Sequence, residues 1–172
     1  MYRGWHRLDA PASEVPPLLS ICLGRAWRSH RLPNGIVVRF GDRYGELHLH
    51  NAQVVALRER GLSSIQLGLE FRRELRASLT TLARLTGGDG RFSDVGAFSA
   101  ITILHQGLLT RLGFEVEPDG LLAPRVTGAY QYALLLSLSA RPGVHRSLRA
   151  QRLWISRAKL RALYEPPLRR VS

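Results

Sequence analysis

The sequence predicts a single α+β domain with a small mixed or antiparallel sheet packed by helices. Segments with strand-like and helix-like apolar spacing are mixed along the chain, without the strict strand–helix–strand rhythm of a parallel α/β sheet. The chain has 172 residues, and its 45% apolar content is enough for one hydrophobic core. We therefore expect one domain over residues 1–172, with an irregular or helical N-terminal segment at 1–35 and a basic C-terminal part at 141–172.

The first elements are predicted from apolar runs and turn residues. The run at residues 18–30 predicts a short helix with Trp27 on its apolar side. Residues 32–35, with the sequence Leu-Pro-Asn-Gly, predict a turn. Residues 36–40 are rich in β-branched side chains and predict a strand.

A second strand is predicted at residues 46–50, because turn residues at 42–45 precede it. We expect it to pair with the strand at 36–40 across that turn. Asn51 follows as a favourable N-cap residue for a short helix that ends before Gly61.

A longer amphipathic helix is predicted from Ser63 or Ser64, either of which can cap it, to about Leu85, because its apolar residues recur at three- and four-residue steps. The glycine-rich segment 87–90 predicts a loop and lacks the Lys-Ser/Thr of a phosphate-binding loop. The remaining elements are predicted as a strand or helix start at 98–104, a helix at 105–112, a strand at 114–117, a helix at 124–139, a strand at 152–155 and a helix at 156–163. Ser156 is the expected N-cap residue of the last helix.

The net charge of +12 is unevenly distributed along the chain. Residues 1–43 carry seven arginines and three acidic residues, and residues 44–140 carry nine of each. Residues 141–172 carry eight arginines and Lys159 against Glu165 alone. Such a basic segment favours anionic partners: phosphate, nucleic acid or acidic lipid headgroups.

The single cysteine, Cys22, excludes internal disulfides, a cysteine-based zinc site and an iron–sulfur cluster held by this chain alone. It lies in an apolar run and is interpreted as a small core residue. The N-terminal residues lack the apolar stretch of a signal peptide, and no window reaches the ~20 apolar residues that a membrane span needs. We expect a cytoplasmic protein without a transmembrane segment, which the basic segment could hold peripherally at the inner face of the membrane.

Glu46, His48 and His50 are the strongest candidate site. Side chains alternate between the two faces of a strand, so these three share one face and the leucines between them share the other. A His-x-His pair with a carboxylate can bind zinc, iron or manganese, with His105 as the best candidate for a further histidine. The same side chains can perform acid–base catalysis. A structural hydrogen-bond cluster or a solvent-facing strand fits the pattern as well.

The basic C-terminal part is the second candidate. Its cationic residues follow an apolar stretch at 133–138, which Tyr130 and Tyr132 precede, and they are Arg141, Arg146, Arg149, Arg152, Arg157, Lys159 and Arg161. This combination fits docking on an anionic membrane. A buried helix followed by solvated arginines fits as well, and nucleic acid is the third interpretation, although no recognised nucleic-acid-binding motif is present. His6, His30 and His145 are flanked by arginine and are interpreted as surface residues.

Three segments of the chain resemble the YkoP-like domain family. They are residues 41–51 (GDRYGELHLHN), residues 112–116 (LGFEV) and residues 153–157 (LWISR), the last followed by a short helix. They occur in the expected order and, with that helix, span residues 41–163. The resemblance implies a small bacterial domain that occurs alone or beside polysaccharide deacetylase domains, in a cell-envelope setting. It implies no established activity.

We expect a small basic domain that binds an anionic ligand, either a lipid phosphate or a sugar phosphate, because the planar guanidinium group of arginine binds phosphate oxygens at two points. The expected ligand-binding residues are Arg43, His105, Arg146, Arg149 and Arg152. The alternative is a small metal-dependent or acid–base enzyme centred on Glu46, His48 and His50. A nucleic-acid-binding module is the third hypothesis. The sequence identifies no reaction and no cofactor beyond the transition metal of the metal hypothesis.

Overall fold

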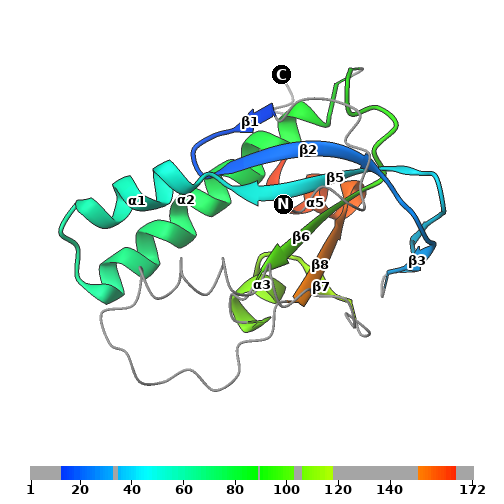
Figure 1. Ribbon diagram of the computed structural model, residues 1–172. Helices are drawn as coiled ribbons and strands as arrows, with labels where there is room; N and C mark the ends of the chain where they lie inside the picture. Colours follow the sequence, from blue (N-terminus) through cyan, green and yellow to red (C-terminus); the bar gives the residue numbers. More distant parts are fainter. Residues whose placement is uncertain (1–12, 33–34, 89, 103–105, 118–150, 166–172) are drawn as a thin grey trace, which may run out of the picture.

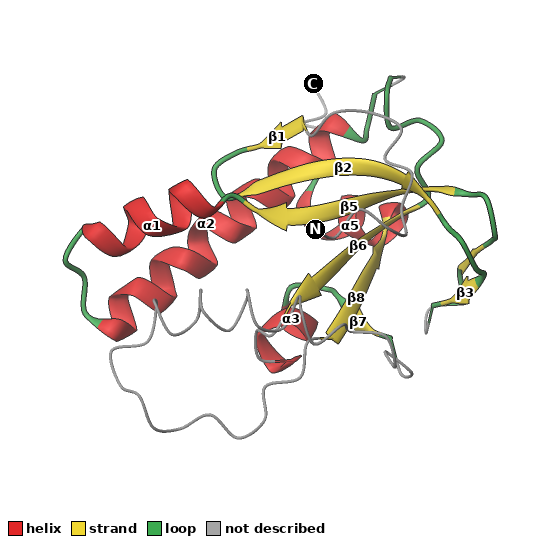
Figure 2. Ribbon diagram, viewed as in Figure 1, coloured by secondary structure: helices red, strands yellow, loops and turns green. Residues whose placement is uncertain are grey.

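The computed structural model describes residues 13–32, 35–88, 90–102, 106–117 and 151–165. These residues form a mixed six-stranded sheet with helices packed on one face (Figures 1 and 2), which confirms the α+β prediction. The helices are α1 (Asn51–Glu59), α2 (Ser64–Leu85), α3 (Gln106–Arg111) and α5 (Arg157–Tyr164). None of the helices in the described part of the chain is long and apolar enough to cross a membrane.

The sheet has the strand order β1-β2-β5-β6-β8-β7. Its strands are β1 (Ser13–Val15), β2 (Leu19–Arg25), β5 (Arg43–Leu49), β6 (Ala97–Thr102), β7 (Glu115–Val116) and β8 (Gln151–Ser156). The β5–β6 pair is parallel, and the other neighbouring pairs are antiparallel. A separate two-stranded hairpin consists of β3 (His30–Arg31) and β4 (Val37–Val38).

The two faces of the sheet are buried by different elements. The larger core combines strand residues with residues of all four described helices, among them Val54, Leu79, Leu109 and Leu160. A smaller core lies on the opposite face, where the β3–β4 hairpin packs on the sheet. It consists of Ala26, Leu32, Val38, Tyr44, Ala97 and Trp154, with Ile36 packed against it.

Two of the predicted helix caps are present. The Ser63 side chain accepts a hydrogen bond from the backbone N–H of Gln66, whose side chain accepts one from Ser63, so α2 begins with a complete capping box. The Ser156 side chain accepts from the Lys159 backbone N–H and caps α5.

The structure confirms four further predicted elements to within a few residues. They are the helices at 105–112 and 156–163 and the strands at 114–117 and 152–155. Of the two alternatives for residues 98–104, the structure has a strand, β6.

The prediction that Asn51 caps α1 is wrong, because the cap is His50. The His50 backbone is extended, with φ −81° and ψ 98°, and its side chain makes no cap hydrogen bond. Its backbone N–H still donates to the Leu18 carbonyl, so the β2–β5 ladder continues to this residue and the helix begins directly after it.

The prediction of a helix at 18–30 is also wrong, since residues 19–25 form β2 and the N-terminal segment contributes two strands to the sheet. Residues Leu19, Ile21 and Leu23 pack in the larger core, and Cys22 between them is buried as expected. A strand buried on both faces is a continuous apolar run, which periodicity does not distinguish from a short helix. Trp27 is exposed rather than part of an apolar helix face.

The predicted pairing of residues 36–40 with 46–50 is wrong as well. Only Val37 and Val38 of that segment form a strand, and they pair with β3. Strand β5 instead pairs along its whole length with β2, from Leu19 opposite Leu49 to Arg25 opposite Arg43. Seven paired positions with a buried strand exclude more apolar surface from water than a short local hairpin does.

The predicted helix at 124–139 lies outside the described residues.

Gly45 allows β5 to pack closely in the larger core, and this yields a stability prediction. A Cβ atom at position 45 would lie 2.5 Å from Phe98 Cδ1 and 2.6 Å from Ile21 Cδ1. We expect Gly45→Ala to destabilise the protein by about 1–3 kcal/mol through overpacking. Urea unfolding monitored by circular dichroism measures this change.

The matched control is Gly68→Ala, since Gly68 lies inside α2 with no atom within 4 Å of its added Cβ. We expect the same substitution there to stabilise the protein by about 0.5–1 kcal/mol, because alanine is the better helix former. Equal effects at the two positions would contradict the packing described for Gly45.

Candidate functional site

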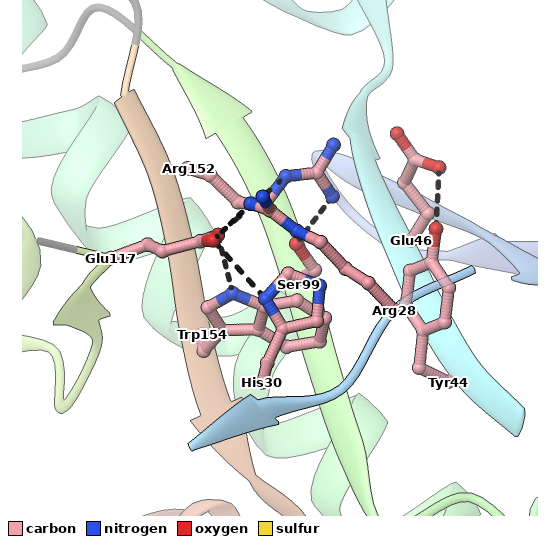
Figure 3. A network of polar contacts seen from close by, with 8 residues as sticks. All are labelled: Arg28, His30, Tyr44, Glu46, Ser99, Glu117, Arg152 and Trp154. Carbon is pink, nitrogen blue, oxygen red and sulfur yellow. Dashed lines mark hydrogen bonds and ion pairs between the residues drawn. The ribbon is translucent and has the colours of Figure 1, made fainter. Parts of the chain in front are cut away.

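Polar side chains gather on the face of the sheet opposite the helices. Leu47 in β5 and Leu153 in β8 point into the larger core, so strand alternation places their neighbours on the other face. The register sets Glu46 opposite Ser99, and Ser99 opposite Trp154. The polar network on this face consists of Arg28, His30, Tyr44, Glu46, Ser99, Glu117, Arg152 and Trp154 (Figure 3).

The Glu117 carboxylate is the centre of this network. Arg28 Nη2 donates to Glu117 Oε1 at 2.7 Å, and His30 Nδ1 lies 3.1 Å from the same oxygen. Trp154 Nε1 donates to Glu117 Oε2 at 3.1 Å, and Arg152 Nε lies 3.9 Å from that oxygen. One side chain just after β7 therefore joins the β2–β3 connection, the hairpin strand β3 and the sheet strand β8 (Figure 3).

Glu117 remains ionised although its side chain is only 12% exposed. Burial alone would raise the pKa of this carboxyl group. The hydrogen bonds from His30 and Trp154, together with the charges of His30 and Arg28, outweigh burial and lower the pKa from 4.5 to about 2. The site therefore contains a fixed negative charge at any physiological pH.

Two guanidinium groups lie side by side around this carboxylate (Figure 3). Arg152 Nη1 donates to the buried Ser99 hydroxyl at 3.2 Å. The Arg28 guanidinium lies 5.0 Å from the centre of the Trp27 ring, a cation–π distance. Arg28 Nε is buried without a hydrogen-bond partner in the described part of the chain. Both arginines are therefore held by partners on several sides, and Arg28 Nε is left as a donor without a partner among the described residues.

Tyr44 and Glu46 form the other end of the network. Tyr44 Oη donates to Glu46 Oε2 at 3.5 Å, and the Tyr44 ring packs 5.5 Å from that of Trp154. Burial, and then the charge of Glu46, raises the pKa of Tyr44, so the phenol keeps its proton. Cys22, opposite Glu46 in β2, forms no disulfide, and burial raises the pKa of its thiol.

The structure separates the three residues that the sequence singled out. Glu46 belongs to the polar network, whereas His48, two residues further along β5, is exposed. His50 caps α1, and its Nε2 lies 3.9 Å from Glu14 Oε1 across the sheet. Among the described residues, no three His, Cys, Asp or Glu side chains form a group able to hold a metal ion. The further candidate, His105, lies outside the described residues.

One expected anion-binding residue, Arg152, belongs to the network. Arg43 instead forms a two-point ion pair with Asp94, with Nη1 2.9 and 2.8 Å from the two carboxylate oxygens. His105, Arg146 and Arg149, as well as His6 and His145, lie outside the described residues.

The cationic residues of α5 have structural partners. Lys159 Nζ lies 2.8 Å from Glu115 Oε1, and Arg161 Nε lies 2.7 Å from Glu165 Oε2. Arg157 donates to two backbone carbonyls, including that of Ser93 at 2.7 Å. Arg157 and Lys159 attach α5 to other segments, and Arg161 pairs with the C-cap residue of the same helix, so the described end of the basic segment is not a uniform anion-binding surface.

Sequence reasoning missed Arg28, His30 and Glu117. The interpretation of His30 as a surface residue is wrong, because its side chain is only 10% exposed and contacts Glu117 and the Trp154 ring. Glu117 comes from a segment 87 residues away, so no local pattern indicated this contact. The available signal was indirect, since Tyr44, Glu46 and Trp154 lie in the segments that resemble a known family.

A family model described as the YkoP domain matches residues 27–164, which is most of the chain and includes every residue of the polar network. No curated protein and no solved structure matches the chain significantly.

The low pKa of Glu117 predicts an acid-dependent loss of stability. A folded-state pKa of about 2 against an ordinary value of 4.5 means that the ionised carboxylate stabilises the fold above pH 4.5 and loses this effect as the pH falls towards 2. We expect Glu117→Gln to be destabilised at neutral pH, and its difference from the wild-type protein to shrink over that acidic range. Urea unfolding at a series of pH values measures this difference.

Glu59→Gln, on the exposed side of α1, is the matched control, and we expect a small and nearly constant offset from the wild-type protein. A Glu117→Gln difference that stays constant from neutral to acidic pH would contradict the ionised, hydrogen-bonded state of Glu117.

Proposed function

The chain belongs to the YkoP domain family, and we propose that the polar network inside its matching region binds an anionic ligand that carries a phosphate group. The observation that supports this proposal is the pair of guanidinium groups, Arg28 and Arg152, held on one carboxylate. A lipid phosphate and a sugar phosphate in a cell-envelope setting both present the required chemistry.

The balance of donors and acceptors favours an added anion. Each guanidinium has five N–H donors and no acceptor. Glu117 accepts one hydrogen bond from Arg28, and the Ser99 hydroxyl accepts one from Arg152. The planar donor groups of arginine match phosphate oxygens in two-point contacts, which are among the stronger hydrogen bonds in proteins.

The electrostatics of the site point the same way. Arg28 and Arg152 carry two positive charges against the single negative charge of Glu117, so these three groups keep an excess of +1. The Arg152 and Glu117 side chains are largely shielded from solvent, which limits screening by salt. The Glu46 carboxylate, which accepts from Tyr44, balances the formal charge of the whole network, so the positive excess is local to the two arginines on Glu117. Glu117 positions these arginines for an anion and neutralises one of their two charges.

Titration with inorganic phosphate and with glucose 6-phosphate tests the proposal. The indole N–H of Trp154 donates to Glu117 and is a local reporter in ¹H–¹⁵N NMR spectra. We expect a saturable shift of this signal with a dissociation constant in the millimolar range or below. Arg28→Gln and Arg152→Gln should each weaken binding about tenfold, which corresponds to about 1.4 kcal/mol.

Arg84→Gln, at the exposed end of α2, removes the same charge outside the network and should leave the titration unchanged. Arg28→Lys separates charge from geometry, because lysine retains the charge and loses the planar donor group. The absence of a saturable shift, or equal weakening by Arg84→Gln, would overturn the proposal.

An acid–base enzyme is the second candidate, and the contact of Glu46 with Tyr44 in the same network favours it. In this case Glu46 accepts a proton from the water that attacks the phosphorus of a bound phosphate ester, the P–O bond to the alcohol or phenol breaks, and that group leaves. Glu46→Gln should then abolish turnover of a phosphate ester such as p-nitrophenyl phosphate while phosphate binding persists. With binding as the only function, the wild-type protein should turn over none of this ester, and Glu46→Gln should bind phosphate equally or more tightly.

A further inference from the structure

Three large apolar side chains are exposed on the corner where the chain leaves β2 and forms the β3–β4 hairpin. Trp27 is 43% exposed, Val37 is 40% exposed and Phe40 is 74% exposed. The hairpin strand β3 extends away from the helices at this corner (Figure 1). We call the exposed surface of Trp27, Val37 and Phe40 the aromatic corner.

The backbone of the aromatic corner is held in place by hydrogen bonds. Ala26 N–H donates to the Asp42 carbonyl at 2.9 Å, and Gly41 N–H donates to the Ala26 carbonyl at 2.7 Å. Phe40 N–H donates to the Ser29 hydroxyl at 3.1 Å. Trp27 and Phe40 therefore lie on two segments that are fastened to each other.

The inward-pointing residues of these segments are already buried. Ala26 and Val38 belong to the smaller core, and they flank Trp27 and Val37 in the sequence. Because Ala26 and Val38 point into the core, the neighbouring side chains of Trp27 and Val37 point towards solvent. The aromatic corner is therefore exposed without any change in the conformation of the hairpin.

The charge around the aromatic corner is mostly positive. Residues 25–40 contain four arginines and no acidic residue, and a carboxylate fastened to this corner, that of Asp42, accepts from the Arg39 backbone N–H. Arg25, Arg31 and Arg39 are exposed, and Arg28 is partly buried in the polar network. Exposed aromatic side chains combined with arginine are the composition that partitions into the headgroup region of an anionic bilayer.

We propose that the aromatic corner docks on an acidic lipid bilayer, with Trp27 and Phe40 among the headgroups and the exposed arginines on the lipid phosphates. The exposed basic residues are attracted to the anionic surface, and the aromatic rings add burial from water. This inference goes beyond the phosphate site, since it stands on residues that do not belong to the polar network. It assigns the membrane contact to the N-terminal half of the chain.

Flotation with vesicles tests the proposal. The full chain is mixed with vesicles of phosphatidylcholine alone, or with vesicles in which phosphatidylglycerol replaces part of it. We expect binding to the acidic vesicles only, with a steep loss as salt rises. The Trp27→Ala/Phe40→Ala and Arg31→Gln/Arg39→Gln double variants should each bind at least tenfold more weakly.

Two double variants on the helices are matched controls and should bind like the wild-type protein. Ile65→Ala/Leu69→Ala removes exposed apolar side chains from α2, and Arg58→Gln/Arg84→Gln removes two exposed charges. Equal binding to neutral and acidic vesicles, or equal losses in these controls, would overturn the proposal.

The same variants separate this proposal from the phosphate site and from other partners of the aromatic corner. The phosphate titration of Trp154 should be unchanged in a Val37→Ala/Phe40→Ala variant, which removes apolar surface from the corner and leaves the Trp27 ring on the Arg28 guanidinium. Retained vesicle binding in Trp27→Ala/Phe40→Ala, combined with a change from dimer to monomer in light scattering, would overturn membrane docking and assign the corner to self-association. Loss of phosphate binding in Arg152→Gln with intact vesicle binding would support docking as an independent property.

Discussion

One buried carboxylate connects the parts of this structure that the backbone leaves separate. Among the described residues the β3–β4 hairpin forms its own two-stranded sheet, so its position on the larger sheet depends on the small apolar core and on Glu117, which contacts Arg28, His30 and Trp154. Removing Glu117 would leave three partners without their shared acceptor, which is strongly destabilising for a buried charge. The Glu117 carboxylate thus fixes both the position of the hairpin and the geometry of the two arginines.

The sequence predicted the α+β class and the parts of the fold that are encoded locally. The Ser63 cap, the Ser156 cap and the alternation that separates Glu46 from Leu47 are predicted from neighbouring residues, and all three are present. The strand-pairing errors depend on distant residues, whereas the Asn51 cap is a local error of one residue. The sequence of β2 predicts a helix, because burial on both faces of the strand removes the period-two signal.

The candidate site shows the same division. Glu46 was identified because it stands in a polar pattern on one strand, and it does belong to the network. His48 and His50 stand in the same pattern, but the strand ends between them and their side chains go to solvent and to a helix start. The residues around Glu117 and around His30 do not indicate a site. The two side chains lie 87 residues apart in the sequence, and only the fold brings them to 3.1 Å of each other. The site is assembled from five chain segments, and the contacts between them depend on the topology of the sheet rather than on any local pattern in the sequence.

Arg28 has two neighbours with different requirements. Its guanidinium lies on the Trp27 ring on the surface, and its Nη2 donates to Glu117 in the interior. A lysine at this position would keep the charge, but it would lose both the flat stacking surface and the directed pair of donors. A single substitution at position 28 would therefore disturb two contacts at once, one with the surface ring at position 27 and one with the buried carboxylate at position 117.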